Sequence, residues 1–398
     1  MTAPAGTWRT HPVRAAVLVD HPSQHIAPGL RLLTERVEIR PRVYYWNPAT
    51  RGVYDRGFGR HVRWNVDLHS GYDWWAPPTG ASAGRRWMAA WRKLHRDRPD
   101  VVLTFGWASP IARVGIAYST VTRTPLLYYG DTNGHVEPTT WRHRLRGLVL
   151  RRLFRRAAGA VSTGAFNRDF YLAHGLPPEL VYPGVLPANV TLFHSVAAPR
   201  RRLRDQEGAE RALVIGFAGK FTSVKGVPDM VDAVARLPRD RPWKLHLIGD
   251  GPLRPQLESA VAQRDLTERV HFLGFRNADE LPALMSEIDI MVMPSRKEPR
   301  GLVAIEAMAA GAAVVVSSAT GLWGPGDVIQ HRRTGVVFPA GDVEALATCI
   351  RELLGDPGLR TCLATAGQAQ SLSFGPADFA STVGDALLAT IRGNSDGG

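Results

Sequence analysis

The chain of 398 residues contains little cysteine and no long apolar run. Its two cysteines, Cys349 and Cys362, are too few for a disulfide framework. No apolar run approaches the roughly 20 residues that a membrane span needs. The apolar stretch Ala15–Val19 ends at Asp20 and is therefore predicted to be a first strand rather than a signal peptide. These features predict a cytoplasmic protein.

Several motifs of nucleotide and metal chemistry are also missing. The loop Gly219–Gly226, G-K-F-T-S-V-K-G, does not match the Walker pattern, so P-loop ATP hydrolysis has no support. Gly249 and Gly251 lack the third glycine of a dinucleotide fingerprint. His21 and His25 are four residues apart, but a proline between them disfavours a helical metal pair, and no H-E-x-x-H motif occurs. We expect neither a metal nor a cofactor.

The length and the order of apolar segments predict two α/β domains. A chain of this length exceeds one ordinary core, and two domains of about 150 to 200 residues are the default. In the first half, apolar strands alternate with helical stretches, which implies a parallel sheet. The strands predicted there are Ala15–Val19, Val37–Trp46, Val101–Phe105, Leu126–Tyr129 and Ala158–Val161.

Composition suggests where the domains divide. We expect residues 1–194 to form the first domain and residues 211–375 the second. Residues 195–210 are polar and show no periodic pattern, so we interpret them as a linker. Residues 376–398 contain one further helix-like segment and end in G-N-S-D-G-G, which we expect to be disordered.

Two glutamates eight residues apart, Glu298 and Glu306, are the most informative feature. Ile288–Pro294 has the pattern of a buried strand and Leu302–Ala310 that of a helix. The helix N-terminus would face the carboxyl edge of a sheet, where backbone N–H groups attract a diphosphate. Carboxylates repel phosphates, so these two are expected to hold hydroxyls. A nucleotide sugar has both kinds of group, although glutamates at this spacing are also common on solvated helix faces.

The glycine-bounded loop Gly219–Gly226 strengthens this interpretation. It follows the strand-like segment Leu213–Ala218 and precedes a helix that Pro228 is suited to open. Lys220 and Lys225 stand at opposite ends of the loop and can neutralise two phosphates. Further strands that end in glycine turns are predicted within 244–252 and 270–275.

Together these segments, from about Leu213 to Pro357, resemble the nucleotide-sugar-binding half of the GT-B glycosyltransferases. The resemblance is to the large retaining family often called family 4, the glycosyl transferases group 1. It implies two Rossmann-like domains facing each other across a cleft, with the acceptor domain first and the last helix crossing back to it. The implied enzyme transfers a hexose, with retention, from a nucleoside diphosphate sugar to an acceptor hydroxyl. UDP is favoured over GDP, and the acceptor would be a cell-surface glycan, a lipid-linked glycan or a secondary metabolite.

The resemblance also implies roles for residues of the second half. Glu298 would contact hydroxyls of the donor sugar and Glu306 those of the ribose, while the basic loop would hold the diphosphate. One departure stands out, because Arg300 occupies a position where the family usually has Phe. The implied donor-binding residues are Gly219, Lys220, Lys225, Phe275, Glu298, Gly301, Leu302, Val303 and Glu306.

Two loops of the first half are expected to open into the cleft. In Asp20–Leu30 the glycine pair usual in relatives is absent, and His25 or Gln24 would meet the acceptor or the donor phosphate. In Tyr128–His135 family members often place a polar residue near the reacting sugar. Asp131 is our first choice there and His135 the second, with a turn or capping role for Asp131 equally open. We therefore predict Glu298, Asp131 and His25 as catalytic residues.

A third segment, 54–72, resembles an acceptor-side loop with a D-x-G-F-G pattern found in a subset of these enzymes. Aromatic side chains in and after this segment are of the kind that stack on sugar faces, although such clusters more often belong to a core. These side chains are Phe58, Trp64, Tyr72, Trp74 and Trp75.

The excess of positive charge lies entirely in the first half of the chain. Residues 1–200 carry 27 Lys and Arg against 12 Asp and Glu, whereas residues 201–398 carry 22 against 24. The segment Trp141–Arg156 holds seven arginines among leucines and is predicted to be an amphipathic basic helix. It could serve an anionic membrane or an acidic acceptor, or be a solvated helix packed by its leucines. No nucleic-acid module is present, so we expect no nucleic-acid partner.

Two other function classes stay open at this point. A sugar-nucleotide 2-epimerase shares the architecture but needs a differently built acid/base site. A non-catalytic scaffold is disfavoured because Lys220, Lys225, Glu298 and Glu306 are all present.

Overall fold

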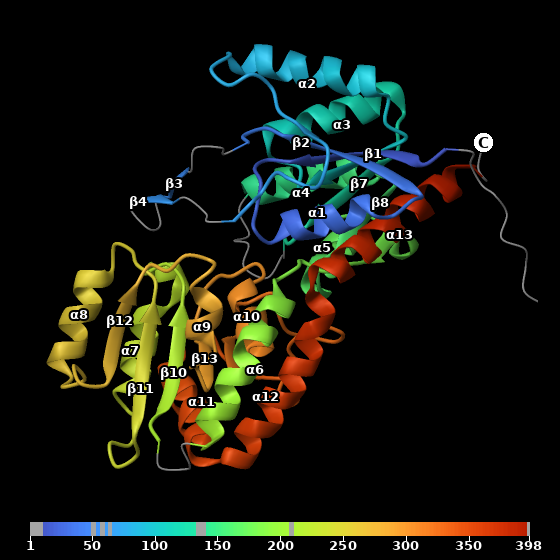
Figure 1. The fold of residues 1–398 in the computed structure, drawn as a ribbon. Helices are drawn as coiled ribbons and strands as arrows, with labels where there is room; N and C mark the ends of the chain where they lie inside the picture. The colour runs from blue at the N-terminus through green and yellow to red at the C-terminus, as the bar shows by residue number, and fades with distance from the viewer. Residues whose placement is uncertain are drawn as a thin grey trace, which may run out of the picture.

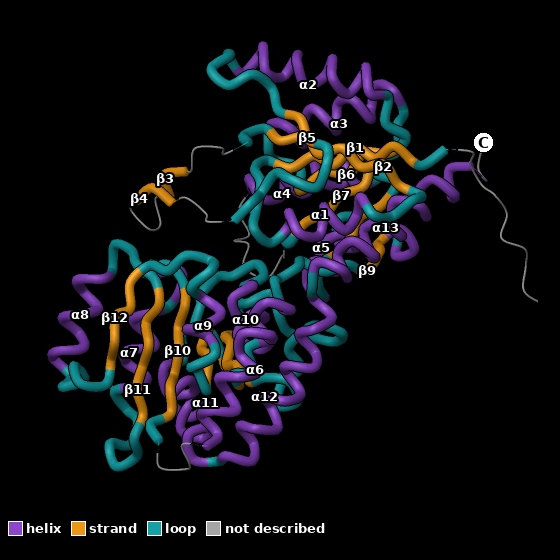
Figure 2. Tube along the Cα trace, viewed as in Figure 1, coloured by secondary structure: helices purple, strands orange, loops and turns teal. Residues whose placement is uncertain are grey.

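The computed structural model describes residues 11–48, 53–55, 60–62, 66–132, 141–206 and 211–395. These residues form two α/β domains, each built on a parallel sheet with helices on both faces (Figure 1). The predicted fold class is therefore confirmed. Figure 2 shows the two sheets as separate groups of strands, one in each domain.

The first domain contains a seven-stranded sheet in which every neighbouring pair is parallel. The chain begins in the middle of this sheet and extends it first to one side and then to the other. The strand order is β5 (Trp74–Trp75), β2 (Ile39–Tyr45), β1 (Val13–Val19), β6 (Val101–Phe105), β7 (Leu126–Gly130), β8 (Gly159–Ser162) and β9 (Val181–Pro183).

Helices cover both faces of this sheet, so its central strands are apolar along almost their whole length. One face carries α1 (Ile26–Thr34) and α13 (Pro376–Ser395). The other carries α2 (Ala83–Asp97), α3 (Pro110–Thr122), α4 (Trp141–Phe154) and α5 (Ala165–Ala173). A separate two-stranded ribbon is formed by β3 (Val53–Asp55) and β4 (Arg60–Val62).

The second domain repeats the plan with a six-stranded parallel sheet. The strand order is β12 (Val270–Gly274), β11 (Trp243–Ile248), β10 (Leu213–Ala218), β13 (Ile290–Met293), β14 (Ala313–Ser317) and β15 (Val336–Phe338). One face is covered by α7 (Val227–Val234), α8 (Arg254–Gln263) and α11 (Val343–Gly355). The other is covered by α6 (Val190–Gln206), α9 (Leu281–Met285) and α10 (Leu302–Ala309), and α12 (Pro357–Ser371) lies beside α10 and β14.

The segment interpreted as an unpatterned linker is helical up to Gln206. Residues 195–206 are the second part of α6, which contains Pro199 and packs against α9 and α10. Val190, Phe193 and Ala197 are buried on one face of this helix. Their spacing of three and four residues is that of a helix. The predicted linker began at residue 195, in the middle of this pattern, so the pattern was not recognised.

The chain passes between the domains at two adjacent places. One is the segment before α6, and the other is the segment before α13, where Ala188 N donates to Phe374 O at 2.9 Å. Helix α13 then runs along the first domain beside α1 (Figure 1). Its side chains Phe379, Val383 and Leu387 are fully buried in the core of that domain.

Candidate active site

The candidate donor site lies at the carboxyl edge of the second sheet. Since all the strands are parallel, the loops after β10, β12 and β13 meet at this edge. They carry Lys220, Phe275 and Glu298 respectively. The chain order reverses around β10, whose neighbours are β11 and β13. Open α/β sheets bind ligands at such a switch point.

Helix α10 presents its N-terminus to this edge. Its N-cap is Gly301, with a φ of +76°, and no side chain caps the helix. A Cβ at this glycine would lie 2.5 Å from Met293 Sδ, so both the backbone angle and the space require glycine. Leu302 and Val303 are only half-buried. Their amides are placed to bind an anion such as a diphosphate.

The basic loop approaches the same edge because of Gly226. This residue has a φ of +68°, and a Cβ on it would lie 2.0 Å from Pro294 O. The close contact brings Lys225 beside Glu298, and Lys225 Nζ forms an ion pair with Glu298 Oε2. The Glu298 side chain is 12% exposed and that of Lys225 29%. Sequence analysis assigned both residues to one site but did not predict that they form an ion pair with each other.

The backbone of Glu298 is fixed on both sides. Its N–H donates to Ala319 O at 3.1 Å, and its carbonyl accepts from Gly321 N at 2.9 Å. The carboxylate is therefore held in place by the main chain as well as by Lys225.

The second glutamate meets the first domain. Glu306 lies in α10, and its Oε1 is 3.7 Å from Nδ1 of His25, which precedes α1. Burial raises the pKa of Glu306 to about 8 and lowers the pKa of His25 to about 4. At neutral pH these shifts favour the protonated carboxyl and the neutral imidazole. This contact thus joins two uncharged groups that can each donate or accept a hydrogen bond.

Asp131 follows β7 at the carboxyl edge of the first sheet. Burial raises its pKa, and the positive charge of Arg300 lowers it to a smaller extent. Asp131 is therefore within electrostatic reach of the second domain. His135 lies outside the described residues.

Arg300 is buried, with only 3% of its side chain exposed. Its Nη1 donates to Asp327 Oδ2 at 2.8 Å and to Gly321 O at 2.5 Å. Asp327 Oδ2 also accepts from Ala165 N, at 3.2 Å, in the first domain. The charge at the position where the family usually has Phe is thus neutralised by Asp327. Sequence analysis did not single out Asp327, because no local pattern connects it to Arg300.

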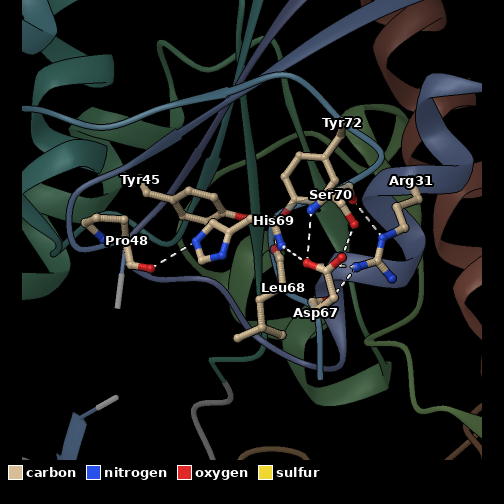
Figure 3. A network of polar contacts seen from close by, with 8 residues as sticks. All are labelled: Arg31, Tyr45, Pro48, Asp67, Leu68, His69, Ser70 and Tyr72. Atoms are coloured by element: carbon tan, nitrogen blue, oxygen red, sulfur yellow. Dashed lines mark hydrogen bonds and ion pairs between the residues drawn. The ribbon is translucent and has the colours of Figure 1, made fainter. Parts of the chain in front are cut away.

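A polar network holds the loop after β4 against α1 (Figure 3). Arg31 donates from Nε to Ser70 O at 2.8 Å and from Nη2 to Asp67 O. On the other side, His69 Nε2 donates to Pro48 O at 3.0 Å. Since Pro48 and His69 lie before and after residues 49–65, this bond joins the two ends of that segment. The network also fixes α1, the helix that follows His25.

The predicted acceptor-side aromatic residues divide into two groups. The hydroxyl of Tyr72 lies 2.8 Å from that of Tyr45 and donates to a carbonyl of the same loop. Tyr72 therefore supports the sheet (Figure 3). Trp74 is 36% exposed and lies against His69. Phe58 and Trp64 lie outside the described side chains.

Within residues 11–395, apart from the gaps given above, no three His, Cys, Asp or Glu side chains gather as a metal site. No described helix is sufficiently long and apolar to cross a membrane.

The family model of the glycosyl transferases group 1 matches residues 199–370. The 2-deoxystreptamine glucosyltransferase of Streptomyces kanamyceticus is 34% identical over 280 residues, 69% of this chain and 70% of the relative. The alpha-D-kanosaminyltransferase of the same organism is 32% identical over 42% of this chain and 43% of its own length. The lipopolysaccharide core biosynthesis glycosyltransferase LpsD of Rhizobium meliloti is 29% identical over 80% of this chain and 84% of its own.

Solved structures show the same fold. Anabaena Alr3699/HepE in complex with UDP superposes with a TM-score of 0.73 at 21% identity, covering 95% of this chain and 100% of that one. A glycosyltransferase from Rickettsia africae superposes with a TM-score of 0.71 at 13% identity, covering 96% of this chain and 99% of the other. The chain therefore belongs to the glycosyl transferases group 1 family and is a glycosyltransferase of GT-B fold.

Proposed function

We propose that the protein transfers a hexose from UDP-hexose to an acceptor hydroxyl with retention of configuration. The observation that carries the proposal is the Lys225–Glu298 ion pair at the uncapped N-terminus of α10. It places a cation, a carboxylate and free amides at one edge. A ligand with a diphosphate next to hydroxyls matches this combination. Anabaena Alr3699/HepE, which has the same fold, has been solved in complex with UDP and with UDP-glucose, which supports a uridine nucleotide here.

Donor binding would rearrange the ion pair. A diphosphate on the α10 amides would attract Lys220 and Lys225, so Lys225 would turn from the carboxylate towards phosphate. Glu298 would then be available to accept hydrogen bonds from sugar hydroxyls. Glu306, on the next turns of the same helix, would meet the ribose. The backbone near Phe275 would face the base.

The chemical step would depend on position and charge. The departing phosphate would help to deprotonate the acceptor hydroxyl on the same face of the sugar, so no protein nucleophile is needed. Lys220, Lys225 and the helix N-terminus would stabilise the charge that develops on the diphosphate. His25 and Asp131, from the facing domain, would contact the acceptor or the reacting sugar.

The acceptor is proposed as a secondary metabolite or a glycan. One relative is named a 2-deoxystreptamine glucosyltransferase, and another is named for lipopolysaccharide core biosynthesis. An acceptor screen should therefore contain both small polyhydroxylated molecules and lipid-linked glycans.

Helix α4 supports peripheral contact with an anionic membrane. Leu150 and Phe154 face the domain core, whereas Leu145, Leu148 and Val149 are 56%, 61% and 53% exposed. Four arginines of the same segment, at positions 151, 152, 155 and 156, are also exposed. A helix face with apolar and basic side chains suits the boundary between lipid headgroups and acyl chains. Some leucines of this helix therefore lie in the core and others face solvent, so packing against the domain explains only part of its apolar sequence.

The function is tested by donor turnover with and without acceptors. Purified protein is incubated with UDP-glucose, UDP-galactose, UDP-N-acetylglucosamine and GDP-mannose, alone and with the acceptor panel. Transfer should require an acceptor, with at most slow hydrolysis in its absence. Conversion of a UDP-sugar into its 2-epimer without acceptor would contradict the proposal and favour an epimerase. Thermal shift ranks the nucleotides, because a ligand at ~100 times its Kd adds ~2.7 kcal/mol to the free energy of unfolding.

A further inference from the structure

The N-terminus of α5 in the first domain has its cap in the second domain. The N-cap residue of α5 is Gly164, which has no side chain to accept the first amides. Asp327 provides the acceptor instead, since its Oδ2 takes a hydrogen bond from Ala165 N at 3.2 Å. A carboxylate at this end of a helix is favoured by the helix dipole as well.

Asp327 is held for this role by its own domain. Its side chain is fully buried, and its Oδ1 accepts from Val328 N at 2.8 Å. The opposite charge comes from Arg300, at 2.8 Å from Oδ2. A buried carboxylate depends on such a partner, because an uncompensated charge in this position is strongly destabilising.

Arg300 lies in the loop that carries Glu298 and Gly301. The guanidinium therefore joins three parts of the protein: the donor loop, the Asp327 loop and the N-terminus of α5. Its Cζ also lies 5.9 Å from the centre of the Phe374 ring, at the crossing before α13. The domains are thus linked at the same place where the chain passes between them.

The fit at this contact is tight. A Cβ on Gly164 would lie 2.2 Å from Arg300 Nη1 and 2.4 Å from Asp327 Oδ2. Gly164 has a φ of 165°, which is extended backbone that other residues adopt, so the space and not the angle requires glycine. A side chain here would act as a wedge between the domains without touching Glu298 or the basic loop.

A second contact lies beside the first. Phe166 of α5 packs edge-on against Trp323, with ring centroids 5.2 Å apart. Among the described residues, Arg300 Nε and Nη2 find no hydrogen-bond acceptor although both are buried. Buried guanidinium groups seldom leave donors unpaired, and this marks the position as more than a packing site. The charge of Arg300 also acts on Asp131 of the first domain.

We propose that Arg300 is a positioning residue that sets the acceptor domain relative to the donor loop, by holding Asp327 as the cap of α5. The inference rests on the proposed function, since it assigns the two domains their donor and acceptor roles. It makes the interdomain contact part of catalysis: UDP binding would depend mainly on the second domain, whereas sugar transfer would need both domains in their correct relative position.

The test compares two substitutions made from opposite sides of the contact. Arg300→Leu removes the charge from the donor loop, and Gly164→Ala inserts a methyl group from the first domain. Gly84→Ala is the matched control, because a Cβ there meets no atom within 4 Å. Asp327→Asn, which keeps one acceptor oxygen but loses the charge and the second acceptor, is a milder third variant. For each, kcat and KM for transfer from UDP-glucose are measured, with the Kd of UDP by calorimetry.

We expect Arg300→Leu and Gly164→Ala each to lower kcat at least tenfold and to change the Kd of UDP less than threefold. The double variant should be no worse than the poorer single variant, because both break one contact. The kcat of Asp327→Asn should lie between the values for these two variants and the value for the Gly84→Ala control. The inference is overturned if Gly164→Ala keeps kcat within twofold of the wild type, or if the Kd of UDP weakens as much as kcat falls. In the latter case Arg300 belongs to the donor site itself.

Small-angle scattering separates this inference from the proposed function. Arg300→Leu and Gly164→Ala should both increase the radius of gyration of the UDP-bound protein, while Gly84→Ala should not. If the wild type transfers no sugar with any donor and acceptor, the proposed function fails while the scattering result still decides the link. If both variants scatter like the wild type, the link is overturned whatever the activity.

Discussion

The two domains share a plan but differ in how they present chemistry. The second domain is nearly neutral in net charge. Its candidate site residues lie together at one sheet edge, on a glycine-bounded loop and on the first turns of α10. The first domain carries all the excess positive charge, and its polar residues lie on separate loops at its carboxyl edge. A diphosphate is the same group in every nucleotide sugar, so one backbone arrangement serves it. Under the proposed function the acceptors vary in structure, so the first domain, which would bind them, has no common chemical group to recognise.

The largest predicted effect sharpens this contrast in the donor half. Lys225→Ala or Glu298→Ala removes one partner of a charge-assisted contact, which costs ~2–5 kcal/mol and lowers kcat/KM by roughly 30-fold to several thousandfold. The measurement is transfer with saturating acceptor and limiting donor. Lys244→Ala, at an exposed position near the start of β11, is the control and should stay close to the wild type.

A charge swap distinguishes pairing from function. The double variant Lys225→Glu, Glu298→Lys keeps an ion pair at this place, so stability should be largely retained while transfer is lost. Near-wild-type transfer by either alanine variant or by the swap would refute the donor-site assignment.

The second prediction concerns the edge where the domains meet, at Glu306. Its pKa is raised from 4.5 to about 8 in the folded protein, so between these values the unfolded chain has released a proton that the folded chain still holds. The free energy of unfolding should therefore fall as pH rises from about 6.5 to 8; below about pH 6.5 the lowered pKa of His25 contributes a slope of opposite sign, which offsets that of Glu306. The contribution is at most about 1.4 kcal/mol per pH unit.

Denaturant unfolding from pH 6.5 to 8 measures this slope. Glu306→Gln should flatten it, whereas the exposed Glu268→Gln should leave it unchanged. A Glu306→Gln variant with the same slope as the wild type would show that this carboxyl ionises normally in the fold.

The smallest expected effect tests the first domain. Replacing Arg151, Arg152, Arg155 and Arg156 with Gln should weaken sedimentation with anionic vesicles, since each Arg near such a surface contributes ~1 kcal/mol. The binding should also decline as salt rises, because the Debye length is ~10 Å at about 0.1 M. UDP affinity should not change. Leu148→Ser should lower vesicle binding through the apolar term without altering the charge.

If the wild type shows no preference for anionic over neutral vesicles at low salt, the membrane proposal fails. A soluble acceptor, such as a secondary metabolite, then becomes the better proposal, and the acceptor panel is narrowed to soluble molecules.

Local patterns predicted most of the fold and the donor edge. Buried strands such as β13 and β14 are short apolar runs between turn residues, and Gly219–Gly226 and Glu298–Glu306 are local in sequence. The Lys225–Glu298 ion pair could not be predicted from the sequence, because it depends on how closely two loops approach each other at Gly226. The Arg300–Asp327 ion pair joins two residues that are 27 positions apart, and the Asp327–Ala165 hydrogen bond joins two that are 162 positions apart. No local sequence pattern predicts contacts over such separations.

The packing of α13 has a consequence for how the chain folds during synthesis. Its side chains, up to Ile391, complete the core around α1, where a Cβ on Gly29 would lie only 2.4 Å from the Phe379 ring. A ribosome that has released residues 1–190 has thus made every strand of the first sheet but not the helix that covers one of its faces. The domain translated first is completed last, and until then its exposed apolar face is a natural target for a chaperone.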